Sequence, residues 1–181
     1  MIEMDFLKRN LPLWNEIQIV FGLLVFAVFS WSIRGFLFKL SSFLLYNKLG
    51  DIFGIFAYMM AVALLESTVI LLVLLLLAFL LPGKWFSDGF SYKASLLILV
   101  IGIDMIFLQS TLTFKLPSMR SLAAFGGISI ISWLVLIVLT AKVKRFKVIL
   151  DSILERISIF LYIYPPLGCI GLIVVFVRNL L

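Results

Sequence analysis

Long apolar stretches separated by short polar segments dominate the chain. Five of them predict membrane-spanning helices, at roughly 17–33, 53–81, 94–114, 121–141 and 157–177. Each comes close to or exceeds the ~20 residues that an α-helix needs to cross the hydrocarbon core of a bilayer. Since lipid cannot satisfy backbone polar groups, helices are the expected form. The pattern predicts an all-α, polytopic membrane helix bundle, with residues 1–181 forming a single integral membrane domain.

The second predicted span is the longest. Between residues 52 and 83 the only charged side chain is Glu66, and Pro82-Gly83 follows the apolar run. About 30 helical residues extend ~45 Å, which exceeds the hydrocarbon thickness, so this helix tilts or projects into the headgroup layer. The preceding segment, 36–49, mixes lysines with aromatic residues. It fits either an amphipathic segment at headgroup level or a continuation of the first helix.

A different pattern occupies residues 143–156. Apolar side chains recur there at helical spacing while charged residues fill the remaining positions. This spacing predicts an amphipathic helix that lies on the membrane surface. The apolar stripe consists of Val143, Phe146, Leu150, Ile153, Leu154 and Ile157.

Composition agrees with the membrane prediction. The chain has 181 residues, of which 64% are hydrophobic and 13% are charged, whereas soluble domains carry ~25% charged residues. The net charge of +6 does not indicate nucleic-acid binding, because the basic residues lie in the short segments between apolar runs, where Lys and Arg contact lipid headgroups. The expected partners are the bilayer and either a membrane protein or a second copy of the chain.

The distribution of Lys and Arg predicts an orientation. Alternating the segments between the two sides places nine of the 15 basic residues on the side of the N-terminus and six on the other. Basic residues are enriched in cytoplasmic loops. We therefore predict a multi-pass protein of the plasma (inner) membrane with a cytoplasmic N-terminus and an external C-terminus. If the segment at Pro165-Pro166 were re-entrant, the C-terminus would return to the cytoplasm.

Most catalytic constellations are excluded by residue type. The sequence contains no histidine and one cysteine, Cys169, within an apolar run. Ser–His–Asp and Cys–His catalysis are therefore impossible, and the commonest zinc and haem ligand is missing. Phosphate-loop, dinucleotide-binding and metalloprotease motifs are also absent. We expect no cofactor, no metal and no self-contained enzyme.

Glu66 and Asp104 form the core of a candidate intramembrane polar site. Each lies near the middle of a predicted span, on consecutive helices joined by a short loop, so they are expected at similar depth. An ionised carboxylate there costs several kcal/mol unless it is paired or hydrated. One interpretation is a site for a proton, cation or substrate. The other is a protonated carboxyl group bonded to Ser67, Thr68, Gln109 or a backbone carbonyl.

Arg34 and Gln109 complete the candidate polar site, and Pro165 and Pro166 form a separate candidate helix break. Arg34 ends the first span and either extends to the interface or turns inward as a counter-ion to the carboxylates. Pro165 and Pro166 interrupt the fifth span, because proline cannot donate a helical hydrogen bond. They predict either a broken helix that lines a cavity or a kink supported by neighbouring helices.

Two pairs of small residues are spaced for close helix packing. Ala57 and Ala61 lie four positions apart on the second span, and Ala123 and Gly127 on the fourth. Small residues at this spacing let two helix backbones approach within a membrane. We interpret both pairs as packing features.

Three segments carry a family resemblance. They are Asp51-Ile-Phe-Gly-Ile-Phe-Ala-Tyr through Ala63-Leu-Leu-Glu66-Ser67, the end Leu81-Pro82-Gly83-Lys84-Trp85-Phe86, and Glu155-Arg156-Ile-Ser through Val177-Arg178-Asn179-Leu180. Together they resemble bacterial five-span membrane proteins of uncharacterised function, and the membrane region that precedes sulfatase-like hydrolase or phosphotransferase domains. The resemblance implies a cytoplasmic N-terminus and a role as membrane anchor or partner of an envelope or lipid-modifying enzyme. The metal-binding Asp, His and Thr pattern of such domains is absent, so no catalytic residue carries over.

The sequence leaves more than one function open. Short loops, the missing catalytic groups and the surface helix favour a non-catalytic subunit, anchor or scaffold that acts with a larger partner. The alternative is a small proton- or cation-coupled transporter or channel-like protein that uses Glu66 and Asp104. An intramembrane lipid-modifying enzyme would need water at the same carboxyl groups.

Overall fold

The computed structural model describes residues 12–81, 89–111, 118–142 and 144–180. These residues form α-helices joined by short turns and one 3-10 segment, with no strand among them. Five helical stretches are long and apolar enough to cross a membrane. The protein is an all-α, multi-pass membrane helix bundle, as predicted. Its elements are α2 (Trp14–Tyr46), α3 (Leu49–Leu80), α4 (Phe90–Thr111), α5 (Met119–Lys142), α6 (Lys144–Ile157), η1 (Ser158–Tyr162) and α7 (Tyr164–Leu180).

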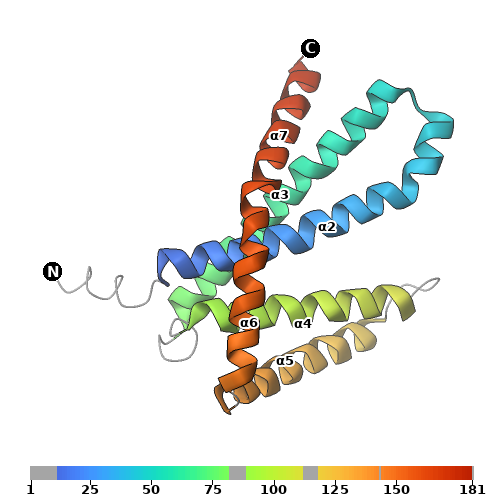
Figure 1. The fold of residues 1–181 in the computed structure, drawn as a ribbon. Helices are drawn as coiled ribbons and strands as arrows, with labels where there is room; N and C mark the ends of the chain where they lie inside the picture. The colour runs from blue at the N-terminus through green and yellow to red at the C-terminus, as the bar shows by residue number, and fades with distance from the viewer. Residues whose placement is uncertain (1–11, 82–88, 112–117, 143, 181) are drawn as a thin grey trace.

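The bundle consists of two helical hairpins crossed by a long terminal rod (Figure 1). Helices α2 and α3 form the first hairpin, and α4 and α5 form the second. The chain then runs through α6, η1 and α7 as a nearly continuous helix that crosses both hairpins and extends along α3. This order places α2 at the centre, in contact with α3, α4, α6, η1 and α7.

Helix α2 continues well past the predicted first span. It runs unbroken from Trp14 to Tyr46, and Asn47-Lys48 turns the chain into α3. The segment after Arg34 is therefore a continuation of the first helix. At 1.5 Å per residue, its 33 residues extend ~50 Å, so one end projects beyond a ~30 Å hydrocarbon core.

Three clusters of buried side chains hold the helices together. Near the start of α2, Val20 and Leu24 pack against the end of α3 and the beginning of α4. Leu23 packs on α4 and α6. Farther along, Val25 and Phe29 pack against Met60 and Ala63 of α3. The core thus follows α2 along most of its predicted span.

Helix α5 is the least packed element. It contacts α4 and α6, and the most apolar 18-residue window of its span contains no buried residue, although Thr140 near its end is buried. One fixed contact is the hydrogen bond that Nε1 of Trp133 donates to the backbone carbonyl of Lys93, at 3.0 Å. Most of its surface is therefore available to lipid or to another protein.

The amphipathic helix forms as predicted. Leu150 and Leu154 of α6 are buried against Leu23 and Leu96, whereas Ile153 of the predicted apolar stripe is exposed. Val143 and the side chain of Phe146 lie outside the described residues. The helix crosses the bundle near the beginnings of α2 and α4. It does not end there, because η1 carries the chain directly into α7.

Helix α7 runs antiparallel to α3. Its beginning packs near Leu64, and its end reaches Asp51. Since the beginning of α2 lies beside the end of α3, Trp14 and Leu180 lie at opposite ends of the bundle. Within the described residues, α6, η1 and α7 together cross the bundle without turning back.

Candidate functional site

Glu66 lies near the middle of α3 with an exposed side chain. Its neighbours on the same helical surface, Val62, Leu65 and Val69, are each more than half exposed. Within the described part of the chain, Glu66 makes no hydrogen bond or ion pair. A carboxyl group therefore projects from an otherwise apolar outer surface at mid-span.

Asp104 has a different environment. It is half-buried on α4, and the hydroxyl of Ser129 on α5 donates a short hydrogen bond to its Oδ2. The same hydroxyl lies 2.9 Å from the backbone carbonyl of Phe125, one turn earlier on α5. The hydrogen bond from Ser129 to Asp104 links α4 to α5 within their apolar spans. The rings of Phe107 and Phe125 make a second contact between the same two helices.

The structure does not join the two carboxyl groups. Glu66 lies on the first hairpin, whereas Asp104 faces α5 within the second. The principal contacts of α4 are with α2 and α5 rather than with α3. Thr68 and Ser67, the expected partners of Glu66, donate instead to backbone carbonyls one turn earlier, at 2.8 and 2.7 Å. Gln109 belongs to α4, but its side chain lies outside the described part of the structure.

Arg34 stacks on an aromatic ring of its own helix. Its side chain is exposed, and its guanidinium carbon lies 5.2 Å from the centre of the Trp31 ring. Cation–π pairs of this kind, with Trp at headgroup level, are typical of membrane interfaces. No ion pair links Arg34 to Glu66 or Asp104 among the described residues.

Pro165 and Pro166 mark a real break in the terminal rod. The chain changes from α-helix to 3-10 helix at Ser158, and α7 begins at Tyr164. Both prolines therefore lie in the first turn of α7, where backbone N–H groups have no intrahelical acceptor. The rings of Phe29 and Tyr164 stack beside the break, with centroids 5.1 Å apart. The break is thus supported by packing and needs no water-filled cavity.

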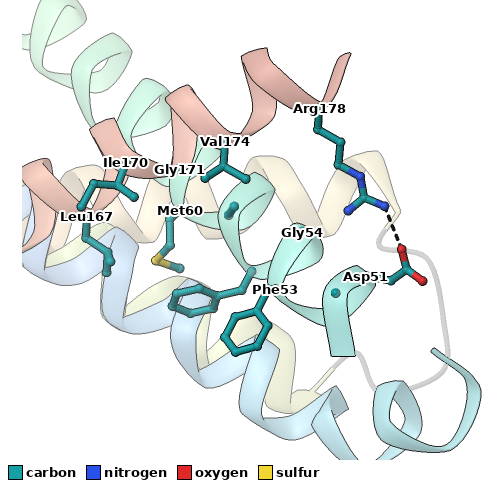
Figure 2. Close-up of a pocket in the computed structure, with 12 residues that line it drawn as sticks. Asp51, Phe53, Gly54, Met60, Leu167, Ile170, Gly171, Val174 and Arg178 are labelled. Carbon is teal, nitrogen blue, oxygen red and sulfur yellow. Dashed lines mark hydrogen bonds and ion pairs between the residues drawn. The ribbon is translucent and has the colours of Figure 1, made fainter. Parts of the chain in front are cut away.

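A groove of about 500 Å³ lies between α3 and α7 (Figure 2). It runs along the first half of α3 and most of α7, and most of its wall is apolar. Its lining residues are Gly50, Asp51, Phe53, Gly54, Phe56, Ala57, Met60, Leu167, Ile170, Gly171, Val174 and Arg178. The prolines do not line it.

An ion pair closes one end of this groove. Nη2 of Arg178 donates to Oδ1 of Asp51 at 2.9 Å, and both side chains are about half exposed, at 46% and 47%. Nearby, the hydroxyl of Tyr58 donates to the side-chain oxygen of Asn179 at 2.7 Å. A Cβ atom at Gly54 would overlap Nη1 of Arg178. The missing side chain therefore lets the guanidinium lie across α3 (Figure 2).

Farther along α3 from the ion pair, small residues let α3 and α7 approach closely. A Cβ atom at Gly171 would lie 2.6 Å from the carbonyl oxygen of Ala57 and 3.1 Å from the backbone nitrogen of Ala61. One at Gly168 would lie 2.7 Å from Cβ of Leu64. The predicted small pair on α3 is used here, since its backbone touches glycine on α7. By contrast, Gly126 and Gly127 on α5 have no neighbour within 4 Å.

The groove did not emerge from the sequence analysis. Its ion pair joins residues 127 positions apart, and no periodic pattern connects them. The described residues contain no group of three or more acidic or cysteine side chains that could hold a metal ion. The chemistry available at the groove is therefore one cation and one anion at the end of an apolar channel.

Comparison of the chain with models of known protein families, with curated proteins and with solved structures finds no match. Function is accordingly argued from the geometry of the bundle.

Proposed function

We propose that this chain is a non-catalytic integral membrane subunit, anchor or scaffold that acts with a larger membrane protein. The observation that carries the proposal is the outward position of Glu66. Ionisable residues within membranes almost always face a bundle interior or a hydrated cavity, because exposure to hydrocarbon costs several kcal/mol. An exposed carboxyl group at mid-span is best explained by a second protein that covers it.

The packing of α5 supports the same proposal. Its apolar window is unburied, and the backbone at Gly126 and Gly127 is open to close approach. In membranes, such small-residue surfaces commonly mediate helix association. We further propose that the protein resides in the plasma membrane with its N-terminus in the cytoplasm, which the excess of Lys and Arg on that side favours. The resemblance described above adds envelope or lipid modification as the process served by the partner.

The proposal is tested by photo-crosslinking from position 66 in native membranes. Glu66 is replaced by a benzophenone amino acid, and the matched control carries the same residue at Phe176, an exposed position on α7. Irradiation should join position 66 to one protein of defined mass, identified by mass spectrometry, and the control to lipid. Crosslinks to lipid alone at both positions would contradict the proposal.

A second experiment separates this function from transport. A tagged chain is purified in mild detergent, and the proteins that remain bound are identified. A stoichiometric partner that is lost in Glu66→Arg but retained in Val69→Ala, one turn away on the same exposed surface, supports the subunit role. A chain that purifies alone, together with ion flux that Glu66→Gln abolishes, would favour the transporter alternative.

A further inference from the structure

We propose that the groove between α3 and α7 is a binding site for one phospholipid with an amine-bearing zwitterionic headgroup. An acyl chain occupies the apolar channel, and Asp51 and Arg178 hold the headgroup. This site is independent of the partner proposed above, since it uses a different surface and requires only the chain and a bilayer.

The shape of the groove fits this occupant. Its volume of about 500 Å³ lies in the ~300–1,000 Å³ range of small-molecule sites. Its lining runs from Met60 and Leu167 at one end to Asp51 and Arg178 at the other (Figure 2). Nine residues separate Asp51 from Met60 along α3, or ~13 Å of helix. The polar and apolar parts are thus arranged in series along the helix.

The order of the two parts of the groove matches a lipid leaflet. We take Arg34, beside Trp31, as the interfacial level on α2 because Arg and Trp are typical interfacial residues. Phe36, half a turn farther, packs on Phe56 of α3 with ring centroids 5.1 Å apart. Asp51 lies five residues beyond Phe56, or ~7 Å of helix. Met60 lies four residues from Phe56 in the opposite direction, so Asp51 is on the outer side of the Arg34 level and Met60 on the inner side, which is the order of headgroup and acyl chain.

The charges select the headgroup. The ion pair uses one of the five donors of the Arg178 guanidinium and one oxygen of the Asp51 carboxylate. Both side chains are about half exposed, so each has capacity for a second partner. A phosphate fits the remaining guanidinium donors, and a primary ammonium fits the second carboxylate oxygen. A glycerol headgroup has no cation for Asp51, and a choline headgroup has no N–H donor.

The test uses the full chain in mild detergent with equal amounts of phosphatidylethanolamine, phosphatidylglycerol and phosphatidylcholine. Native mass spectrometry counts the lipids that remain bound. We expect one retained phosphatidylethanolamine per chain. Val174→Trp fills the groove and should lower that occupancy about tenfold, the effect of losing one good contact. The matched control, Ile173→Trp, changes the next residue, which is 63% exposed and does not line the groove, and should retain lipid normally.

Headgroup selectivity provides the second arm. Asp51→Asn should lower the ratio of bound phosphatidylethanolamine to phosphatidylglycerol about tenfold, because Arg178 then faces an anionic lipid unopposed. Glu155→Gln removes the same charge on α6 and should leave the ratio unchanged. Near-ultraviolet circular dichroism checks that each variant is folded.

Three outcomes would overturn the proposal. Equal lipid retention by the two tryptophan variants would mean that the groove does not hold the acyl chain. An unchanged headgroup ratio in folded Asp51→Asn would remove the role of the ion pair. A dimer without retained lipid would mean that a second copy of the chain covers the groove.

Discussion

The close contact between α3 and α7 makes Gly171 the most sensitive test of the fold. Replacing it with alanine adds one methyl group, whose carbon would lie 2.6 Å from the carbonyl oxygen of Ala57. That atom is backbone, so it cannot rotate away. Ordinary contacts begin near 3.4 Å, and the helices must therefore separate locally by about 0.8 Å.

The expected loss of stability follows from this displacement. A gap of ~0.5–1 Å forfeits a quarter to a half of each dispersion contact along the interface, and overpacked cores lose ~1–3 kcal/mol. Alanine recovers up to about 1 kcal/mol, because it orders more readily in a helix than glycine does. We expect Gly171→Ala to lower the free energy of unfolding by about 1–2 kcal/mol.

The control is Gly126→Ala on α5. A Cβ atom there meets nothing within 4 Å, so the helix preference of alanine acts unopposed and stability should stay equal or rise by up to about 1 kcal/mol. Reversible unfolding of both variants in dodecylsulfate is followed by near-ultraviolet circular dichroism, which reports the stacked rings of Phe29 and Tyr164. The reasoning is refuted if Gly171→Ala unfolds at the wild-type midpoint, or if Gly126→Ala is equally damaging.

Three further outcomes are expected in the same unfolding assay. Ser129→Ala removes the hydroxyl that donates to Asp104 and should cost about 0.6–2 kcal/mol, the range of hydrogen bonds between membrane helices; an unchanged midpoint would mean that the bond adds no stability. Phe29→Ala empties a fully buried position and should cost about 3–5 kcal/mol, whereas Phe38→Ala, at an 88% exposed position, should stay within about 0.5 kcal/mol. Pro166→Ala should also change stability by less than about 0.5 kcal/mol, because a first-turn residue gains no intrahelical bond; a larger loss would show that the break depends on proline.

The number and class of the helices were predictable because hydrophobicity acts over whole segments. A run of about twenty apolar residues predicts a membrane-spanning helix regardless of which helices pack beside it. The end of α2 was harder to predict. Arg34 and Lys39 interrupt the apolar run, but they do not interrupt the helix, and the Phe36–Phe56 contact supports it beyond Arg34. A change from apolar to charged residues along the chain therefore does not mark the end of a helix.

The candidate site was harder to predict, since it depends on which helices become neighbours. Chain order places α3 next to α4, and on that basis Glu66 and Asp104 were expected at similar depth. The bundle packs α4 on α2 and α5, and Asp104 bonds to Ser129, so similar depth alone does not bring the two carboxyl groups together. Sequence spacing fixes the face of one helix on which a residue lies, but not the helix that meets that face.

The two sites proposed here use opposite sides of the same helix. At 100° per residue, the nine positions between Ala57 and Glu66 amount to half a circumference of α3. Ala57 touches Gly171 on α7 and lines the groove, so Glu66 points away from α7. A partner that covers Glu66 need not cover the groove, and an acyl chain in the groove leaves the Glu66 surface free. If both proposals hold, α3 separates a lipid-binding side from a partner-binding side, and substitutions on one side should leave binding at the other unchanged.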